Sequence, residues 1–193
     1  FGLHVGDVSQ SDGEEYDNIY FKPYEKFIAN NNVYTCIGNH DIYFDNADTY
    51  LEDFYYSIDN TVTERYYSFK RGKGYFISID SNIDYTKGSE QYNFIKEALH
   101  SDECQSSPWK FVFFHHPPYC ELWDSWGGEE KVRQHLLPLF ENNEVDIVFN
   151  GHTHGYERGF LNNIYYVITG GGGGGLDYYA RDWGHISKSL SVH

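Results

Sequence analysis

Methionine is absent from the 193-residue sequence, and cysteine occurs only three times. The cysteines, Cys36, Cys104 and Cys120, show no C-x-x-C spacing, which excludes a typical zinc–thiolate site and a dense disulfide framework. Cys36 lies in an apolar run and is expected to be buried. Cys104 and Cys120 flank one predicted strand and could form a disulfide, although the spacing does not fix the pairing.

Long apolar runs and an excess of basic residues are also lacking. No segment is long and apolar enough to span a bilayer, so no membrane span is expected. The 14 Lys and Arg residues are outnumbered by 29 Asp and Glu, and the formal net charge is -15. This charge disfavours non-specific binding to nucleic acids, so no nucleic-acid-binding surface is expected. An anionic substrate would need a local positive charge, which bound metal ions can supply.

Aromatic residues, in contrast, are abundant. They make up 19% of the chain, with 19 Tyr and 14 Phe, and 40% of all residues are hydrophobic. Side chains of this kind supply large buried areas and exclude a disordered chain. A chain of this length can bury one core, so we expect a single domain over residues 1–193.

Short apolar runs alternate with helical patterns along the chain. Strands are predicted at residues 1–5, 33–37, 111–114 and 145–149. Helices are predicted at 16–30, 47–56, 89–99 and 129–142, with prolines at 23 and 138 weakening the first and the last. A β-hairpin is predicted over 65–70 and 75–81, joined by the sequence RGKG. This alternation favours an α/β domain with polar residues gathered where strands end.

Polar residues that can bind metals follow the predicted strands. Zinc and iron accept imidazole nitrogens as well as oxygens, so a mixed Asp, Asn and His set suits a catalytic metal centre. The members of this set are Asp7, Asn39, His115, His152 and His154. His152 and His154 are two residues apart and would face opposite ways in an extended strand. A turn, permitted by the flanking glycines, must therefore direct both side chains to one centre.

Four motifs occur in a fixed order: GD at 6–7, GNHD at 38–41, HHPPY at 115–119 and GHTH at 151–154. Together they resemble the calcineurin-like metallophosphoesterases, and most closely the purple acid phosphatase branch. The longer segments GSEQYNFIKEAL, PWKFVFFHHPPY and GHTHGYER extend the resemblance over nearly the whole chain. The resemblance implies a four-layer α/β/β/α sandwich of two mixed sheets flanked by helices.

The resemblance also implies roles for the motif residues. Asp7 would bridge two metals, with Asn39, His115 and His152 on one metal and His154 on the other. These would be two divalent or trivalent ions of iron, zinc or manganese. They would activate a hydroxide that attacks the phosphorus of a small phosphorylated substrate. The implied activity is that of an acid phosphatase-like phosphomonoesterase.

The GNHD motif supplies the two remaining catalytic residues of this scheme. By the resemblance, His40 does not bind metal but contacts the phosphate and protonates the leaving oxygen, a task that suits the pKa of imidazole. Asp41 would orient His40.

The sequence departs from the family pattern in two places. The upstream Asp ligand, from a DxG or DxH motif, is absent before Phe1, so we expect a domain truncated at both ends with one metal position under-coordinated. Gln10 occupies the position of the metal-binding Tyr in the motif GDxxY. Purple colour is therefore not expected, and manganese, zinc or a mixed centre is as compatible with the sequence as iron. The resemblance favours a secreted protein, but no N-x-S/T sequon supports that location.

Two alternatives to a phosphomonoesterase remain open. The same centre could serve a phosphodiesterase or nucleotide hydrolase, because the pocket walls separate these substrates. The departures also allow a catalytically silent fold relative that acts as a binding module. Oligomeric state is not indicated by the sequence.

Several other residues are interpreted more simply. His116 neighbours a ligand on an extended segment and is expected to be structural and not a ligand. The remaining histidines are expected in the core or on the surface: His4, His100, His135, His185 and His193. The glycine run at 170–175 lacks the Lys of a P-loop and is expected to form a loop near the site. Trp123 and Trp126 could form a wall of the substrate pocket.

Overall fold

The structure, a computed structural model, describes residues 1–9, 16–54, 63–177 and 189–192. The strands are β1 (Gly2–His4), β2 (Val33–Thr35), β3 (Tyr67–Arg71), β4 (Gly74–Ser78), β5 (Trp109–Phe113), β6 (Ile147–Asn150), β7 (Tyr156–Leu161), β8 (Ile164–Thr169) and β9 (Ser189–Val192). The helices are the π-helical η2 (Asp17–Phe21), α1 (Lys22–Ile28), α2 (Asp48–Asp53), α3 (Glu90–His100), α4 (Asp102–Gln105), α5 (Glu130–His135) and α6 (Leu137–Asn142).

The strands form two sheets. The larger sheet has the order β3-β4-β5-β6-β8-β7-β9, and its central strands β4, β5, β6 and β8 are parallel. Strands β3, β7 and β9 pair antiparallel, which makes this sheet mixed. In the described residues the smaller sheet is one parallel pair, β1 and β2. The predicted α/β fold with two sheets and helices is confirmed.

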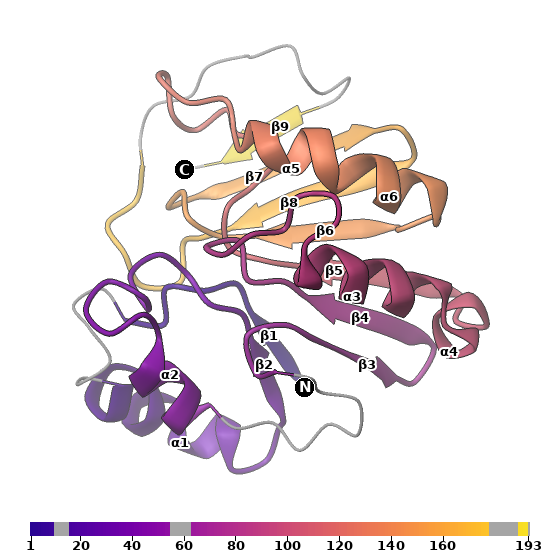
Figure 1. Ribbon diagram of the computed structural model, residues 1–193. Helices are drawn as coiled ribbons and strands as arrows, with labels where there is room; N and C mark the ends of the chain where they lie inside the picture. Colours follow the sequence, from indigo (N-terminus) through magenta and orange to yellow (C-terminus); the bar gives the residue numbers. More distant parts are fainter. Residues whose placement is uncertain (10–15, 55–62, 178–188, 193) are drawn as a thin grey trace.

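The alternation of side chains along the strands of the larger sheet separates two cores. Ile77 and Val112 belong to a buried cluster that includes Ile95 of α3 and residues of α4, α5 and α6. Phe76 and Phe113 point to the opposite face, where their cluster includes residues of β2. Adjacent strand residues face opposite sides of a sheet, so each face is covered by a different layer. Figure 1 shows α3 to α6 along one face of this sheet.

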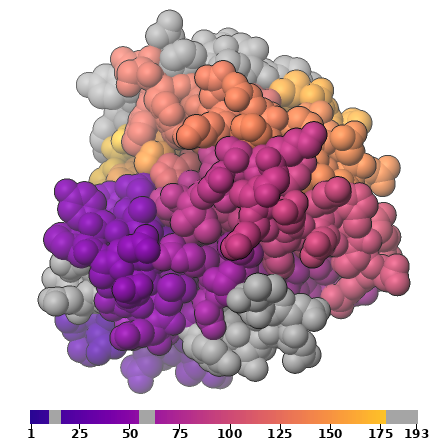
Figure 2. Space-filling model, in the orientation of Figure 1, coloured from indigo at the N-terminus to yellow at the C-terminus, as the bar shows by residue number. Residues whose placement is uncertain are grey.

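A third core covers the outer face of the smaller sheet. Tyr16, Tyr50 and Phe54 pack there with Ile37. The same cluster includes Tyr20 of η2, Ile28 of α1 and Val33 of β2, so these helices pack beside the small sheet, as seen at the purple end of Figure 1. The four layers are therefore helices, the small sheet, the large sheet and helices. Figure 2 shows the purple N-terminal elements below the orange α5 and α6 on one face of the molecule.

Most predicted elements occur close to their expected positions. The hairpin forms with Phe69 opposite Phe76, and Ser89 caps α3 by accepting a hydrogen bond from the Tyr92 N–H at 3.1 Å. The helix predicted at 129–142 is divided into α5 and α6, with Pro138 in the first turn of the second helix. Likewise, Pro23 lies in the first turn of α1. The helix predicted at 47–56 is observed as α2, which ends at Asp53, and residues 55–56 lie outside the described residues.

The disulfide suggested between Cys104 and Cys120 does not form. Both are buried free thiols, as is Cys36. Cys104 belongs to the core beneath α3 to α6, whereas Cys120 packs with Leu122 and Ile168 in a separate cluster. In the described parts of the chain, no helix has both the length and the hydrophobicity to cross a membrane.

Candidate metal centre

The motif residues lie on loops that follow four strands. Asp7 follows β1, and Asn39 follows β2. His115 follows β5, and His152 follows β6. Because β1 is parallel to β2 and β5 is parallel to β6, the carboxyl ends within each pair lie together. Contacts of His115 with Asp7 and Asn39 bring the two pairs of loops to one place.

His115 is the central residue of this site. It is buried, and its Nδ1 lies 2.8 Å from the carbonyl oxygen of Val5. A carbonyl only accepts, so Nδ1 carries the proton and donates it. The other nitrogen, Nε2, lies 2.9 Å from Asp7 Oδ2 and 3.1 Å from Asn39 Oδ1. If the ring is neutral, lone pairs of His115 Nε2, Asp7 Oδ2 and Asn39 Oδ1 converge here, an arrangement that a cation or an additional proton would relieve.

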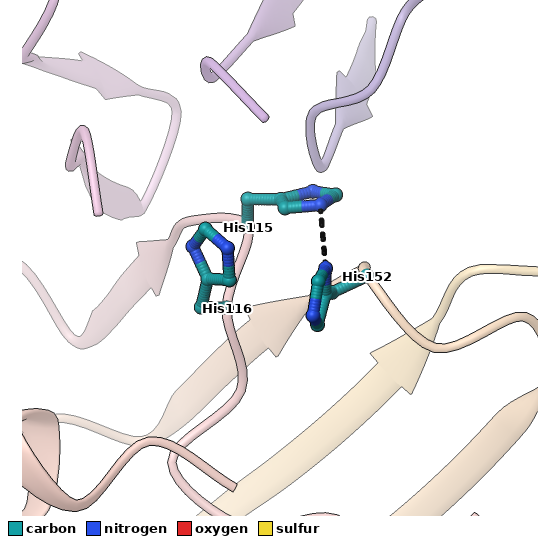
Figure 3. Close-up of side chains that lie close together, drawn as sticks. All are labelled: His115, His116 and His152. Atoms are coloured by element: carbon teal, nitrogen blue, oxygen red, sulfur yellow. Dashed lines mark hydrogen bonds between the residues drawn. The ribbon is translucent and has the colours of Figure 1, made fainter. Parts of the chain in front are cut away.

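His152 adds a further nitrogen to this convergence. Its Nδ1 is 3.2 Å from His115 Nε2, and the dashed line in Figure 3 joins the two rings. The predicted turn is present: His152 has a φ of 70°, and the Thr153 N–H bonds the Gly151 carbonyl at 2.8 Å. Burial, and then the charge of His115, lowers the pKa of His152 to about 4. A neutral imidazole is the form that binds a metal.

Asp7 is held in an unusual backbone conformation beside the GNHD loop. Its φ is 52°, a left-handed value that costs energy for a residue with a side chain and often occurs at functional sites. Oδ1 accepts the backbone N–H of His40 at 2.8 Å. Burial opposes ionisation of Asp7, but the protonated form of His115 and the His40 N–H outweigh it and lower the pKa of this carboxyl. A Cβ at Gly38 would collide with Asp7, so the close approach requires glycine.

His154, which follows the turn at residues 151–153, lines the same cavity as His152. The cavity of about 510 Å³ is lined by Asp7, His115, His152 and His154, together with His4 and glycines of the 170–175 run. The predicted position of this glycine run near the site is confirmed. His154 Nδ1 donates to the Gly175 carbonyl at 2.8 Å, so Nε2 is the ring nitrogen that could bind a metal.

Asp177 fixes this glycine loop against His154. Its Oδ2 accepts the His154 N–H at 2.7 Å and the indole N–H of Trp123 at 2.8 Å. The Asp177 N–H in turn bonds the His154 carbonyl at 2.8 Å. Sequence reasoning missed this residue, because its partners are distant in sequence and no motif surrounds it.

Asp41 joins the GNHD loop to its surroundings. This buried carboxylate accepts the backbone N–H groups of Gly38 at 2.8 Å and Val8 at 3.1 Å, and the Tyr16 hydroxyl at 2.9 Å. Burial nevertheless raises the pKa of Asp41 to about 6. These bonds hold the backbone on both sides of His40, whose side chain is half-buried.

Two tryptophans cover His152. Trp123 and Trp126 place their ring centroids 5.0 and 5.2 Å from that of His152, in edge-on orientation. Their loop is held by Glu157 of β7, which accepts the backbone N–H groups of Glu121 at 2.8 Å and Leu122 at 3.2 Å. Burial raises the pKa of Glu157 to about 7. Glu157 is a second residue that sequence reasoning did not single out.

His116 lies closer to the site than expected for a neighbour of a ligand. Its Nδ1 is 2.7 Å from the Ser81 hydroxyl, and its ring centroid is 4.5 Å from that of His152. Ligating atoms of His115, His116 and His152 all lie within 4.8 Å of one another. Burial and the neighbouring rings lower the pKa of His116 to about 3. Figure 3 shows the three rings grouped at the ends of β5 and β6.

Of the other residues considered in the sequence, one lines the cavity and the rest lie away from it or outside the described residues. His4 lines the cavity, where burial lowers its pKa to about 4. His100 is exposed on α3, and His135 is half-buried in α5. Gln10, His185 and His193 lie outside the described residues.

The donor atoms present fit a transition-metal centre. Asp7 and Asn39 offer oxygens, and His115, His152 and His154 offer nitrogens, a combination that zinc, iron and manganese accept. The convergence of oxygens on His115 Nε2 is the observation that most favours a cation. Hydrogen bonds from two of the histidines to backbone carbonyls provide the orientation that metal ligands usually have.

Comparisons with known proteins agree with this chemistry. The profile of the family described as Calcineurin-like phosphoesterase matches residues 2–156. The chain is 28% identical to Probable inactive purple acid phosphatase 9 of Arabidopsis thaliana over 189 residues, covering 80% of this chain and 29% of the relative. It is 28% identical to the Fe(3+)-Zn(2+) purple acid phosphatase 12 of the same plant over 170 residues, covering 81% and 36%.

A solved structure shows the same fold. Purple acid phosphatase PPD1 from yellow lupin (Lupinus luteus) seeds superposes with a TM-score of 0.72 at 23% identity, over 99% of this chain and 40% of that one. The chain thus spans about a third of the length of the curated relatives it matches.

Proposed function

The chain belongs to the calcineurin-like phosphoesterase family, and we propose that it carries the metal centre of a phosphoric ester hydrolase. The observation that supports this most is the convergence of Asp7 Oδ2 and Asn39 Oδ1 on His115 Nε2, at 2.9 and 3.1 Å. Oxygen and imidazole donors arranged in this way favour iron, zinc or manganese.

Two metal positions would share Asp7. Asn39, His115 and His152 would complete the first position, and His154 would contribute to the second. When bound, the metals would polarise a phosphoryl oxygen and lower the pKa of an attacking water. The protein's part is to hold these donors rigidly, through the Val5 carbonyl at His115 and the Gly175 carbonyl at His154.

His40 would serve as the proton donor to the leaving oxygen. Its backbone N–H is tied to Asp7, so its side chain begins beside the metal-bridging carboxylate. An imidazole in this position can bind a phosphate oxygen and then transfer a proton. Asp41 would support this role because it fixes the backbone of the loop that carries His40.

The proposed substrate is a small phosphate monoester, as in an acid phosphatase. Trp123 and Trp126 would line the side of the site next to His152, where an apolar leaving group could contact them. A phosphodiester or a nucleotide is the alternative substrate for the same centre.

Hydrolysis of an aryl monophosphate and its aryl diester by the metal-loaded chain tests the proposal. We expect faster hydrolysis of the monoester and a 100-fold or greater loss in His40→Ala, in the range typical of a general acid. His100→Ala, on the exposed end of α3, is the matched control and should retain full activity. A preference for the diester would overturn the monoesterase assignment.

A second candidate is a catalytically silent binding module. The relative named probable inactive purple acid phosphatase 9 favours it, since the match includes most of this chain. In that case metal would bind normally, yet hydrolysis by the wild-type chain would not exceed that of His40→Ala.

A further inference from the structure

We propose that His116 is an additional ligand of the metal held by His115 and His152, so that this position is built around three imidazoles. The inference rests on the proposed metal centre and deepens it. Atoms of the three residues that could bind a metal lie within 4.8 Å of one another. In the described part of the chain, this is the one such group of His, Cys, Asp or Glu residues. Two neighbouring loops supply all three side chains, as Figure 3 shows.

The spacing of the nitrogens agrees with a shared metal. With Asp7 and Asn39 this position would have five donors, and at a zinc–nitrogen distance of about 2.05 Å neighbouring donors on one metal lie about 3 to 3.5 Å apart. The His115 Nε2 and His152 Nδ1 atoms are separated by 3.2 Å, within this range. The His116 nitrogen lies within 4.8 Å of the ligand atoms of His115 and His152, and this limit is little more than an ångström above the expected spacing. Metal binding by His116 would therefore require a rotation of its side chain toward His115 and His152.

Ser81 holds His116 through two hydrogen-bond contacts, in the way that neighbouring residues commonly orient a metal-binding histidine. The Ser81 hydroxyl oxygen is 2.7 Å from His116 Nδ1 and accepts the His116 backbone N–H at 3.2 Å. When Nδ1–H donates to this oxygen, Nε2 keeps its lone pair. Metal-binding histidines commonly use one ring nitrogen for such a hydrogen bond and the other for the metal.

A third imidazole should also affect which metal is bound. Imidazole suits zinc and cobalt, whereas manganese prefers carboxylate, carbonyl and water oxygens. Removal of His116 should therefore reduce zinc affinity more than manganese affinity. A structural role for His116 would lower both affinities together or neither.

The test is a titration of the metal-free chain with Zn²⁺, Mn²⁺ and Co²⁺, in which affinity is measured by calorimetry and Co²⁺ coordination by visible absorption. His116→Asn is the main variant, because its amide can replace Nδ1 at Ser81 and so preserves the fold. We expect zinc affinity to fall at least tenfold, manganese affinity to fall less, and the Co²⁺ bands to shift. Ser81→Ala should weaken zinc binding in the same direction, and His100→Ala should bind as the wild type does.

The His152→Ala variant distinguishes failure of the His116 inference from failure of the proposed metal centre. If His152→Ala loses zinc while His116→Asn binds zinc and Co²⁺ like the wild type, His116 is not a ligand and only this inference fails. If the wild-type chain itself binds none of the three metals, the metal centre and the inference both fail. Circular dichroism confirms that each variant is folded before the titration.

Discussion

At the scale of single residues, the centre depends on side chains that are each held by a backbone group. Val5 and Gly175 accept from His115 and His154, and the left-handed φ values of Asp7 and His152 are kept by tight loops. Strained backbone of this kind persists only where surrounding contacts fix it. The proposed donors would therefore be in place before a metal binds, which would reduce the cost of ordering them.

Glu157 should make stability depend on pH. Burial raises its pKa from 4.5 to about 7, so the folded chain holds a proton that the unfolded chain has lost between these values. Stability should therefore fall as pH rises through this window, by about 2 to 3 kcal/mol between pH 5 and pH 8. Glu157→Gln keeps an oxygen for the two amides and lacks this loss. Urea unfolding of both proteins at the two pH values measures the difference, and parallel pH profiles would contradict the assignment.

Some of the site was predictable from single residues and their order. Asp7, Asn39, His115 and the GHTH histidines are recognisable because each follows an apolar strand within a short motif. Glu157 was not, because its role depends on amides 35 and 36 residues away. Burial and long-range contacts of this kind leave no local pattern in the sequence.

At the scale of elements, hydrogen bonds attach whole segments to the motif loops. Tyr16, at the start of η2, donates its hydroxyl to Asp41 at 2.9 Å, and Asp177 attaches the glycine loop to His154 and Trp123. The apolar patterns predicted β1 to β6 and α3 well, because periodicity reflects the face that is buried, but they did not predict β7 or β8. They did not predict the π-helical turn or the division of the last helix at Leu136, where local backbone geometry decides.

Tyr16→Phe should loosen the contact between η2 and the GNHD loop. The change leaves the ring packed but removes one donor from the buried Asp41 carboxylate, at an expected cost of about 1 to 3 kcal/mol of unfolding free energy. Tyr24→Phe is the control, because Tyr24 is exposed on α1. Chemical denaturation should show the difference, and equal stability of the two variants would mean that this bond is not structural.

Asp177→Ala should weaken metal binding without unfolding the chain. Without this carboxylate, the His154 N–H and the Trp123 indole lose a common acceptor, and His154 loses its fixed orientation. Loss of such outer partners typically costs 10- to 100-fold in metal affinity. Glu97→Ala, exposed on α3, provides the control. Unchanged metal affinity in Asp177→Ala would exclude this role for the loop.

At the scale of the whole molecule, the four layers bring the two pairs of loops together. The core between the sheets, with Phe76, Phe113 and Tyr67, fixes the distance between β1 and β5 and hence between Asp7 and His115. The order of motifs predicted this architecture through family resemblance. Composition and periodicity alone gave an α/β domain but not the stacking of one sheet on another, because either face of a strand can be apolar.

Phe113→Ala should destabilise the whole chain. The side chain is fully buried between the sheets, and truncation of such a ring leaves a cavity that costs about 3 to 5 kcal/mol. Trp109→Ala on the same strand should cost much less, since Trp109 is 53% exposed. Thermal unfolding of the two variants compares these costs. A similar loss of stability in both would argue against a core packed between the two sheets.

The amount of metal retained by the chain tests the central claim most directly. After incubation with iron, zinc and manganese and extensive dialysis, elemental analysis by mass spectrometry should find at least one tightly bound metal ion per wild-type chain. His115→Ala should retain much less, because Nε2 of this residue is where the oxygen donors converge. A wild-type chain that retains no metal, or a variant that retains as much as the wild type, would contradict the account.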